Sequence, residues 1–180
     1  MAEDQAREAA ALRRIDEDEP FRVTPDMPAS IASPLAAFKG AKPPSTAWFD
    51  EAVAQAPERS FVTVEGARIE LLTWGERGKP GLIFIHGNSA HADWWSFIAP
   101  FFAADYRVAA LSLSGMGASD WRETYSFETY AEEIFACATA AGLYEAAVKP
   151  VYIGHSFGGA QAFASATRHP GRMSACILVD

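Results

Sequence analysis

The sequence has few of the residues that build metal or disulfide sites. Only two cysteines occur among its 180 residues, Cys137 and Cys176, and both lie inside apolar runs. Neither a Cys-x-x-Cys nor a His-Glu-x-x-His pattern is present, so we expect no metal and no other cofactor. We interpret both cysteines as small buried hydrophobic residues, which is typical of proteins from a reducing compartment.

The sequence also lacks an apolar run long enough to cross a bilayer. Residues 1–19 carry seven acidic and three basic residues and have no apolar core of the kind found in signal peptides. We therefore expect a cytoplasmic protein. Basic residues are in the minority, 15 against 23 acidic ones, and the net charge is −8. An acidic surface disfavours nucleic acids and anionic membranes as partners.

Residues 1–44 differ in composition from the rest of the chain. A charge run occupies residues 16–19, and six prolines between residues 20 and 44 break any long element. We predict a flexible acidic arm over residues 1–44, with a partner-binding arm as the alternative. Residues 45–180 are expected to form one domain. Because 49% of the whole chain is hydrophobic, it can bury a substantial core.

Hydrophobic patterning predicts an α/β fold. Two alternating segments, residues 61–64 and 68–74, predict a β-hairpin. Four continuous apolar runs predict strands that are buried on both faces of a parallel sheet, at residues 82–85, 108–111, 151–153 and 176–179. Helices are expected over residues 48–56, 93–102, 127–141 and 156–168. This alternation predicts a mostly parallel sheet with helices on both faces and the hairpin at its start.

The strongest chemical motif is Gly154-His155-Ser156-Phe157-Gly158, which lies between an expected strand and an expected helix. A serine at this point sits on a sharp, strained turn. Gly154 and Gly158 lack Cβ atoms, so the strand and the helix can approach closely. Ser156 is then exposed at the carboxyl ends of the strands, and the N–H of Phe157 can stabilise an oxyanion. The alternative is a turn without chemistry.

A second motif, His86-Gly87-Asn88, directly follows an expected buried strand. Gly87 allows this loop to turn close to the serine, and the N–H of Asn88 is a candidate for the second oxyanion donor. Three residues that follow, His91, Trp94 and Trp95, are candidates for lining a small apolar substrate pocket. Aromatic residues at such spacing are more often part of a core, which is the alternative for the two tryptophans.

Together the two motifs resemble the α/β-hydrolase superfamily, in the branch of esterases, haloperoxidase-like enzymes, C–C hydrolases and epoxide hydrolases. Residues 111–120 are similar to the family's strand-4 loop, D-x-R-G-x-G-x-S-D, but Ser112 and Ser114 replace its Asp and Arg. The resemblance covers residues 60–180. It implies that Ser156 is the nucleophile, in contrast to haloalkane dehalogenases and epoxide hydrolases, which use Asp at this position.

The catalytic acid and histidine of the family follow the nucleophile in the chain, and the resemblance implies that both usually come after the sixth strand. The sequence ends with Val179-Asp180, at the end of the expected sixth strand. We therefore expect the chain to be part of a longer enzyme and to be inactive alone. Within the chain, His91 is the alternative base and Asp180 the alternative acid.

The predicted function is that of a serine hydrolase which cleaves a small, apolar ester or related acyl substrate through an acyl-enzyme. Two alternatives remain open at this point. One is a non-catalytic binding protein on a degenerate hydrolase scaffold. The other is an acyltransferase or a cofactor-free haloperoxidase that uses the same serine.

Overall fold

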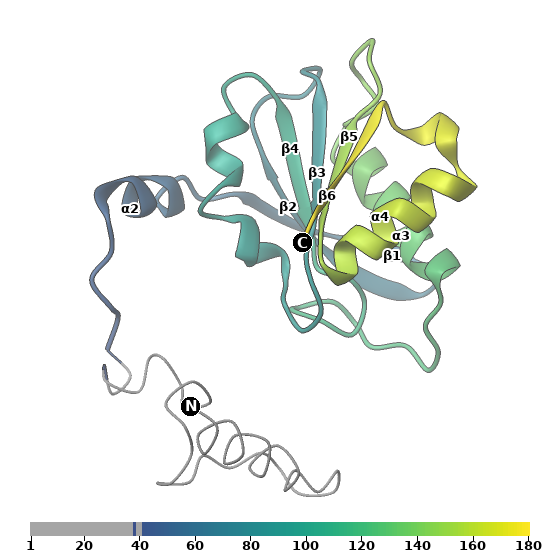
Figure 1. The fold of residues 1–180 in the computed structure, drawn as a ribbon, viewed down its shortest axis with the longest axis horizontal. Coiled ribbons are helices and arrows are strands. Elements are labelled where there is room, and N and C mark those ends of the chain that lie inside the picture. The colour runs from purple at the N-terminus through teal and green to yellow at the C-terminus, as the bar shows by residue number, and fades with distance from the viewer. Residues whose placement is uncertain (1–37, 39–40) are drawn as a thin grey trace, which may run out of the picture. The chain divides into compact units, whose positions relative to one another are not determined.

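The computed structural model describes residue 38 and residues 41–180 (Figure 1). The chain divides into two units between Ser45 and Thr46. The arm expected over residues 1–44 falls almost entirely outside the described residues, so its character stays a prediction. All the described strands belong to the second unit, Thr46–Asp180.

A mixed sheet of six strands, in the order β1-β2-β4-β3-β5-β6, forms the centre of this unit. The strands are β1 (Glu58–Val64), β2 (Ala67–Trp74), β3 (Gly81–Ile85), β4 (Arg107–Leu111), β5 (Val151–His155) and β6 (Ala175–Val179). The predicted hairpin, β1 and β2, is present, and its turn residues Glu65 and Gly66 have φ values of 46° and 83°. The last four strands pair in parallel with one another, and β2 joins β4 antiparallel. The predicted mostly parallel sheet is confirmed.

Three of the four predicted helices form: α2 (Ala47–Val53), α3 (Phe127–Ala140) and α4 (Phe157–Arg168). The helix predicted over residues 93–102 is wrong. Its place is taken by two 3₁₀ helices, η2 (Ala92–Trp95) and η3 (Ala99–Phe102). Pro100 explains the break, because proline has no N–H to donate and its ring blocks a continuous helix. Asp93 lies inside η2, and His91 occupies the cap position instead. A further 3₁₀ helix, η4, spans Pro170–Arg172.

The sheet is covered on both faces, as predicted. Figure 1 shows α3 and α4 together on one side of the strands and the short helices on the other. The side chains of β3 divide accordingly. Ile83 and Ile85 join the core beneath α3 and α4, whereas Leu82 and Phe84 join the core beneath η2 and η3. This division explains why β3 is a continuous apolar run, since each side chain meets a core on its own face.

Strand β6 differs from its prediction. It is the outermost strand, and its residues Ile177, Leu178 and Val179 are 48%, 54% and 42% exposed. The expectation that this run is buried on both faces is wrong for the described residues, because β6 is outermost and the described elements that pack over the sheet leave its side chains largely uncovered. For the same reason Cys176 is only half-buried, while Cys137 is buried in the core as expected; both are free thiols.

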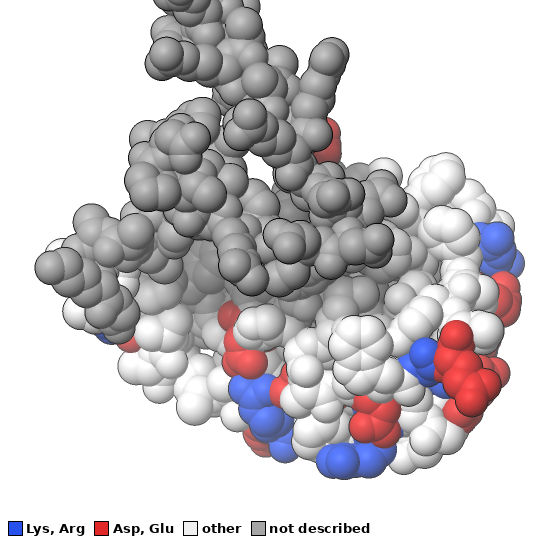
Figure 2. Space-filling model, turned by 90° about the horizontal axis from the view of Figure 1, so that it is seen from below, with Lys and Arg blue, Asp and Glu red and all other residues white. Residues whose placement is uncertain are grey.

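Charges of both signs are interspersed on the surface. On the face in Figure 2, Lys and Arg side chains lie beside Asp and Glu among uncharged residues. Ion pairs such as Arg77–Glu145, 2.5 Å apart, also bring opposite charges together. No helix in the described part of the chain has the length and apolar character needed to cross a membrane. The absence of nucleic-acid and membrane partners stays a prediction.

Candidate active site

Ser156 occupies a strained turn between β5 and α4. Its backbone has φ 50° and ψ −116°, a region that residues with a Cβ atom rarely adopt. The turn is held on both sides: the N–H of Ser156 donates to the carbonyl of Val179 at 2.8 Å, and its own carbonyl accepts from Ala160 at 3.1 Å. The side chain is exposed. The structure therefore has the exposed serine on a sharp turn that the motif predicts.

The glycines around this turn are required by close packing. A Cβ atom on Gly154 would overlap the carbonyl oxygen of Gly158, and one on Gly158 would overlap the carbonyl oxygens at the end of β3. Gly87 lies against the turn from the other side. A Cβ atom there would come within 2.8 Å of His155 Nδ1 and 3.4 Å of the Ser156 Cβ. The loop after β3 can approach the serine only because residue 87 has no side chain.

His86 holds the start of this loop. Its ring is fully buried, and Nε2 accepts a hydrogen bond from the N–H of Leu113 at 3.0 Å. The hydrogen must then sit on Nδ1, which donates to the carbonyl of Gly87 at 2.7 Å. Burial lowers the pKa of His86, so the ring stays neutral. Since both ring nitrogens are occupied, His86 is a structural residue and is not available as a base for Ser156.

The two predicted oxyanion donors are the backbone N–H groups of Asn88 and Phe157. Asn88 is exposed in the loop after β3, and Phe157 is the first residue of α4. Among the described residues, neither backbone N–H has a hydrogen-bond partner. Two unpaired donors therefore lie on the segments that flank the serine. Such donors stabilise a carbonyl oxygen when negative charge develops on it.

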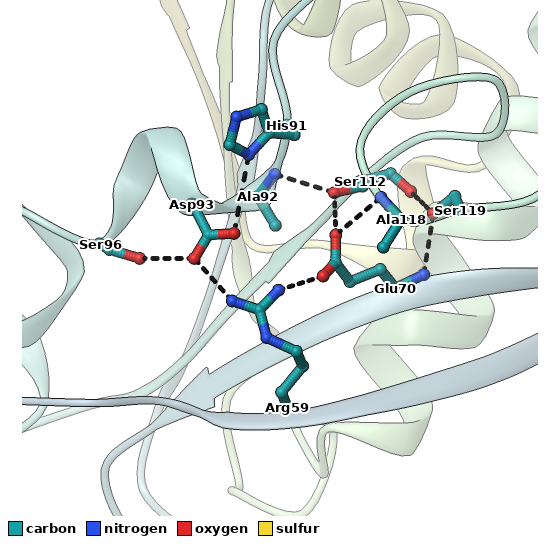
Figure 3. A network of polar contacts seen from close by, with 9 residues as sticks. All are labelled: Arg59, Glu70, His91, Ala92, Asp93, Ser96, Ser112, Ala118 and Ser119. Atoms are coloured by element: carbon teal, nitrogen blue, oxygen red, sulfur yellow. Dashed lines mark hydrogen bonds and ion pairs between the residues drawn. The ribbon is translucent and has the colours of Figure 1, made fainter. Parts of the chain in front are cut away.

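A buried polar network connects to the loops that follow β3 and β4 (Figure 3). Glu70, on β2, has a side chain that is 3% exposed and forms an ion pair with Arg59 on β1. Glu70 also accepts a hydrogen bond from Ser112 Oγ at 2.6 Å. Ser112 Oγ in turn accepts from the N–H of Ala92 at 2.9 Å, and Arg59 donates to Asp93 at 2.8 Å. The network thus joins the hairpin to the loops after β3 and β4.

Glu70 places a buried carboxylate next to Ser112, the position at which the family's strand-4 loop usually has Asp. Besides Ser112, it accepts from the N–H of Ala118 at 3.3 Å, and its own N–H donates to Ser119 Oγ at 2.8 Å. Our sequence analysis missed this residue. The available signal was an acidic side chain at position 70 between the apolar residues Ile69 and Leu71, since a buried carboxylate requires a partner.

A second ion pair fixes the far end of the loop after β4. Glu133, fully buried on α3, lies 2.8 Å from Arg122, whose guanidinium also donates to the carbonyl of Val64 at 2.7 Å. The other carboxylate oxygen of Glu133 accepts from the N–H of Ser114 at 2.9 Å. The loop that contains Ser112 and Ser114 is therefore held by carboxylates from β2 and α3.

None of the four histidines forms a hydrogen bond with the Ser156 hydroxyl among the described residues. The ring of His155 stacks on Trp94 at 6.3 Å. His169 follows α4, about 18 Å along the helix axis from Ser156. His91 is exposed and lies 3.7 Å from Asp93. The base that Ser156 needs is thus not among these contacts, and the alternative roles of His91 and Asp180 stay predictions.

A groove of about 470 Å³ opens beside the serine turn. Its lining includes Asn88, His91, Ser114, Trp121, Tyr125 and Tyr130, but not Ser156 itself. Of the predicted pocket residues, only His91 lies here. Trp95 is 7% exposed and packs on the Phe84 ring at 4.8 Å, so it belongs to the core, while Trp94 covers His155. Neither tryptophan lines this groove, and a substrate contact of Trp94, which is 51% exposed, stays a prediction.

Three possible metal ligands lie together elsewhere in the described chain. Glu128, Glu132 and His169 bring ligand atoms within 4.8 Å of one another. However, Glu128 is already paired with Arg168 at 3.6 Å and with His169 at 3.4 Å. The group also lies at the opposite end of α4 from Ser156. We interpret it as an ion-pair cluster and assign no metal to it.

Comparisons with known proteins agree with this geometry. A family model described as alpha/beta hydrolase fold matches residues 80–180, more than half of the chain. Epoxide hydrolase 4 of Mus musculus is 31% identical over 118 residues, which are 64% of this chain and 32% of that protein. Pimeloyl-[acyl-carrier protein] methyl ester esterase of Edwardsiella ictaluri (strain 93-146) is 30% identical over 102 residues, 57% of this chain and 36% of that protein.

Solved structures give the same result. The crystal structure of epoxide hydrolase A from Mycobacterium thermoresistibile has a TM-score of 0.61 and 28% sequence identity, and the match covers 68% of this chain and 38% of that one. The chain thus spans about a third of the length of the curated relatives it matches. The strand order, the glycine-lined serine turn and these matches lead to one conclusion: the chain belongs to the family of proteins with the α/β-hydrolase fold.

Proposed function

We propose that this chain is the nucleophile-bearing part of a serine hydrolase that cleaves an ester or a related acyl compound of small, apolar character. The observation that carries the proposal is the backbone of Ser156, with φ 50° on a turn enclosed by glycines. Such strain persists only where the surrounding structure enforces it, and it concentrates at functional sites. Here its effect is to expose the hydroxyl group at the carboxyl edge of the sheet.

The reaction follows from the groups around this hydroxyl. Ser156 Oγ attacks the carbonyl carbon while a general base, which the family order assigns to a later segment, removes its proton. The N–H groups of Asn88 and Phe157 receive the negative charge that forms on the carbonyl oxygen. The bond to the leaving alcohol then breaks, and the alcohol takes the proton. Water attacks the resulting acyl-enzyme, releases the acid and restores Ser156.

Epoxide hydrolases are among the relatives, so epoxide opening is the competing reaction. Attack of a serine oxygen on an epoxide carbon would break the ring C–O bond and leave the product joined to the enzyme through an ether. Water does not readily cleave an ether, and the enzyme would stop after one turnover. Attack on an ester carbonyl instead leaves an ester, which water can cleave. The serine at position 156 therefore favours acyl transfer to water.

Burst kinetics with p-nitrophenyl butyrate and the full-length protein test the proposal. We expect about one equivalent of p-nitrophenol in the burst, as an acyl-enzyme that accumulates produces, and no burst from Ser156→Ala. The matched control is Ser60→Ala, which removes an exposed hydroxyl from β1 and should leave the burst unchanged. A burst of undiminished size in Ser156→Ala would show that another group is the nucleophile and would overturn the proposal.

A further inference from the structure

The groove beside the serine turn has no permanently charged side chain in its lining, and its one imidazole is that of His91. None of its lining residues is Lys, Arg, Asp or Glu. Burial raises the pKa of Tyr130, so its phenol stays neutral. The nearest buried carboxylate, Glu133, is already paired with Arg122 at 2.8 Å. An ionised ligand group would lose hydration in the groove without gaining a partner of opposite charge, and the groove therefore suits neutral groups.

Aromatic side chains form one wall of this groove. Trp121 is 81% exposed at its rim. Tyr125 stacks on Tyr130, with centroids 5.8 Å apart and planes 23° apart. Tyr130 then meets the ring of Phe157 edge-on at 5.6 Å. The wall thus runs from solvent to the residue that follows Ser156. Exposed aromatic faces of this kind bind flat rings by stacking.

Ser114 adds a hydrogen-bonding group to the lining. It is completely buried, and among the described residues its Oγ has no hydrogen-bond partner, although its N–H is bonded to Glu133. A buried hydroxyl without a partner is unfavourable until a ligand or a water molecule supplies one. The family's loop has Arg in place of Ser114. Serine is smaller than arginine and carries no charge.

We propose that this groove binds an uncharged aromatic group of the substrate, with the ring stacked against Trp121 and Tyr125 and a ring hydroxyl paired with Ser114 Oγ. The inference rests on the proposed function and names its substrate class, hydroxyaryl esters. Ser114 and Trp121 are then the residues that determine specificity. The volume of about 470 Å³ fits this assignment, since it lies within the usual size range of small-molecule sites.

Binding to the Ser156→Ala form of the chain tests this inference without turnover. The ligands are four methyl esters of similar size: 4-hydroxyphenylacetate, phenylacetate, cyclohexylacetate and 4-carboxyphenylacetate. Dissociation constants are measured by titration with ligand-observed NMR. We expect the hydroxyphenyl ester to bind about fivefold more tightly than the phenyl ester, and the phenyl ester about fivefold more tightly than the cyclohexyl ester. The charged ester should bind most weakly.

Variants assign the effect to residues. Trp121→Ala should weaken binding of both uncharged aromatic esters about tenfold and affect the cyclohexyl ester less. Ser114→Ala, which removes only an unpartnered hydroxyl, should abolish the preference for the ring hydroxyl and retain the preference for a ring. Phe163→Ala, at an exposed aromatic residue on α4 that is 58% exposed and outside the groove, is the control and should change nothing.

Equal affinity for the phenyl and cyclohexyl esters, or a hydroxyl preference that survives Ser114→Ala, would overturn the inference. Its failure is distinguishable from failure of the proposed function. A Ser156-dependent burst with p-nitrophenyl butyrate, together with equal binding of all four esters, would support the proposed hydrolase function and overturn the proposed aromatic specificity. Ring-dependent binding without a burst would support the groove as an aryl site and overturn the hydrolase.

Discussion

The strain at Ser156 should be measurable as a difference in stability between two substitutions. Alanine keeps the Cβ atom and therefore the unfavourable backbone at φ 50° and ψ −116°. Glycine removes the Cβ atom and with it most of the steric cost. The serine hydroxyl has no hydrogen bond in the described part of the chain, and both substitutions remove it, so the two variants differ only in the Cβ atom. The difference between their free energies of unfolding therefore reports the backbone strain at residue 156.

The size of this difference follows from two opposing effects. Strain of this kind costs about 1–3 kcal/mol for a residue with a side chain. A glycine lowers the free energy of unfolding by about 0.5–1 kcal/mol, because it gives the unfolded chain more conformational freedom. The net expectation is that Ser156→Gly has a free energy of unfolding about 0–2.5 kcal/mol higher than that of Ser156→Ala. Urea titration of both variants of the 180-residue chain, followed by tryptophan fluorescence, measures it.

The same pair of substitutions at Ser60 provides the control. Ser60 lies within β1, paired with Leu71, where glycine gains nothing from its freedom. There the order should reverse, and Ser60→Gly should be less stable than Ser60→Ala by about 0.5–1 kcal/mol. If Ser156→Gly is also less stable than Ser156→Ala, the turn is not strained in solution and the argument from strain to function is wrong.

Two further predictions concern the buried groups around the site. Glu70→Ala should lower the free energy of unfolding by about 2–3 kcal/mol in urea titrations, because Ser112 Oγ–H and the N–H of Ala118 lose their acceptor; Glu51→Ala, at an exposed residue of α2, should change it little. Burial lowers the pKa of His86 in the folded chain. Just below pH 6.5 only the unfolded chain therefore binds a proton at this residue, and the free energy of unfolding should fall as the pH drops through that value. An NMR titration in which the His86 ring protonates at its ordinary pKa would contradict this.

Local signals in the sequence were sufficient for the centre of the fold. The apolar runs at β3 and β4 predict strands with a core on each face, because every residue in them is apolar. The serine turn is predictable for a similar reason, since Gly154 and Gly158 are needed within five residues of each other and leave a short, recognisable pattern.

Features that depend on distant contacts were not predictable in this way. Glu70 and Ser112 are 42 residues apart, and their contact exists only because β2 pairs with β4. The groove residues Trp121 and Tyr130 come from a loop and a helix that lie between the two motifs, many residues from either. Composition also does not distinguish an edge strand from a central one, which explains the wrong expectation for β6. The helix predicted over residues 93–102 does not form as one element, because Pro100 fits only the first turn of a helix and begins a separate one.

The central claim is that Ser156 is the nucleophile, and covalent labelling tests it most directly. The full-length protein is treated with a fluorophosphonate, which phosphorylates the activated serine of such enzymes, and the adduct is located by peptide mapping with mass spectrometry. We predict a single adduct on the peptide that contains Ser156, and no adduct in Ser156→Ala. A label on Ser89 or Ser119 that persists in Ser156→Ala would contradict the account.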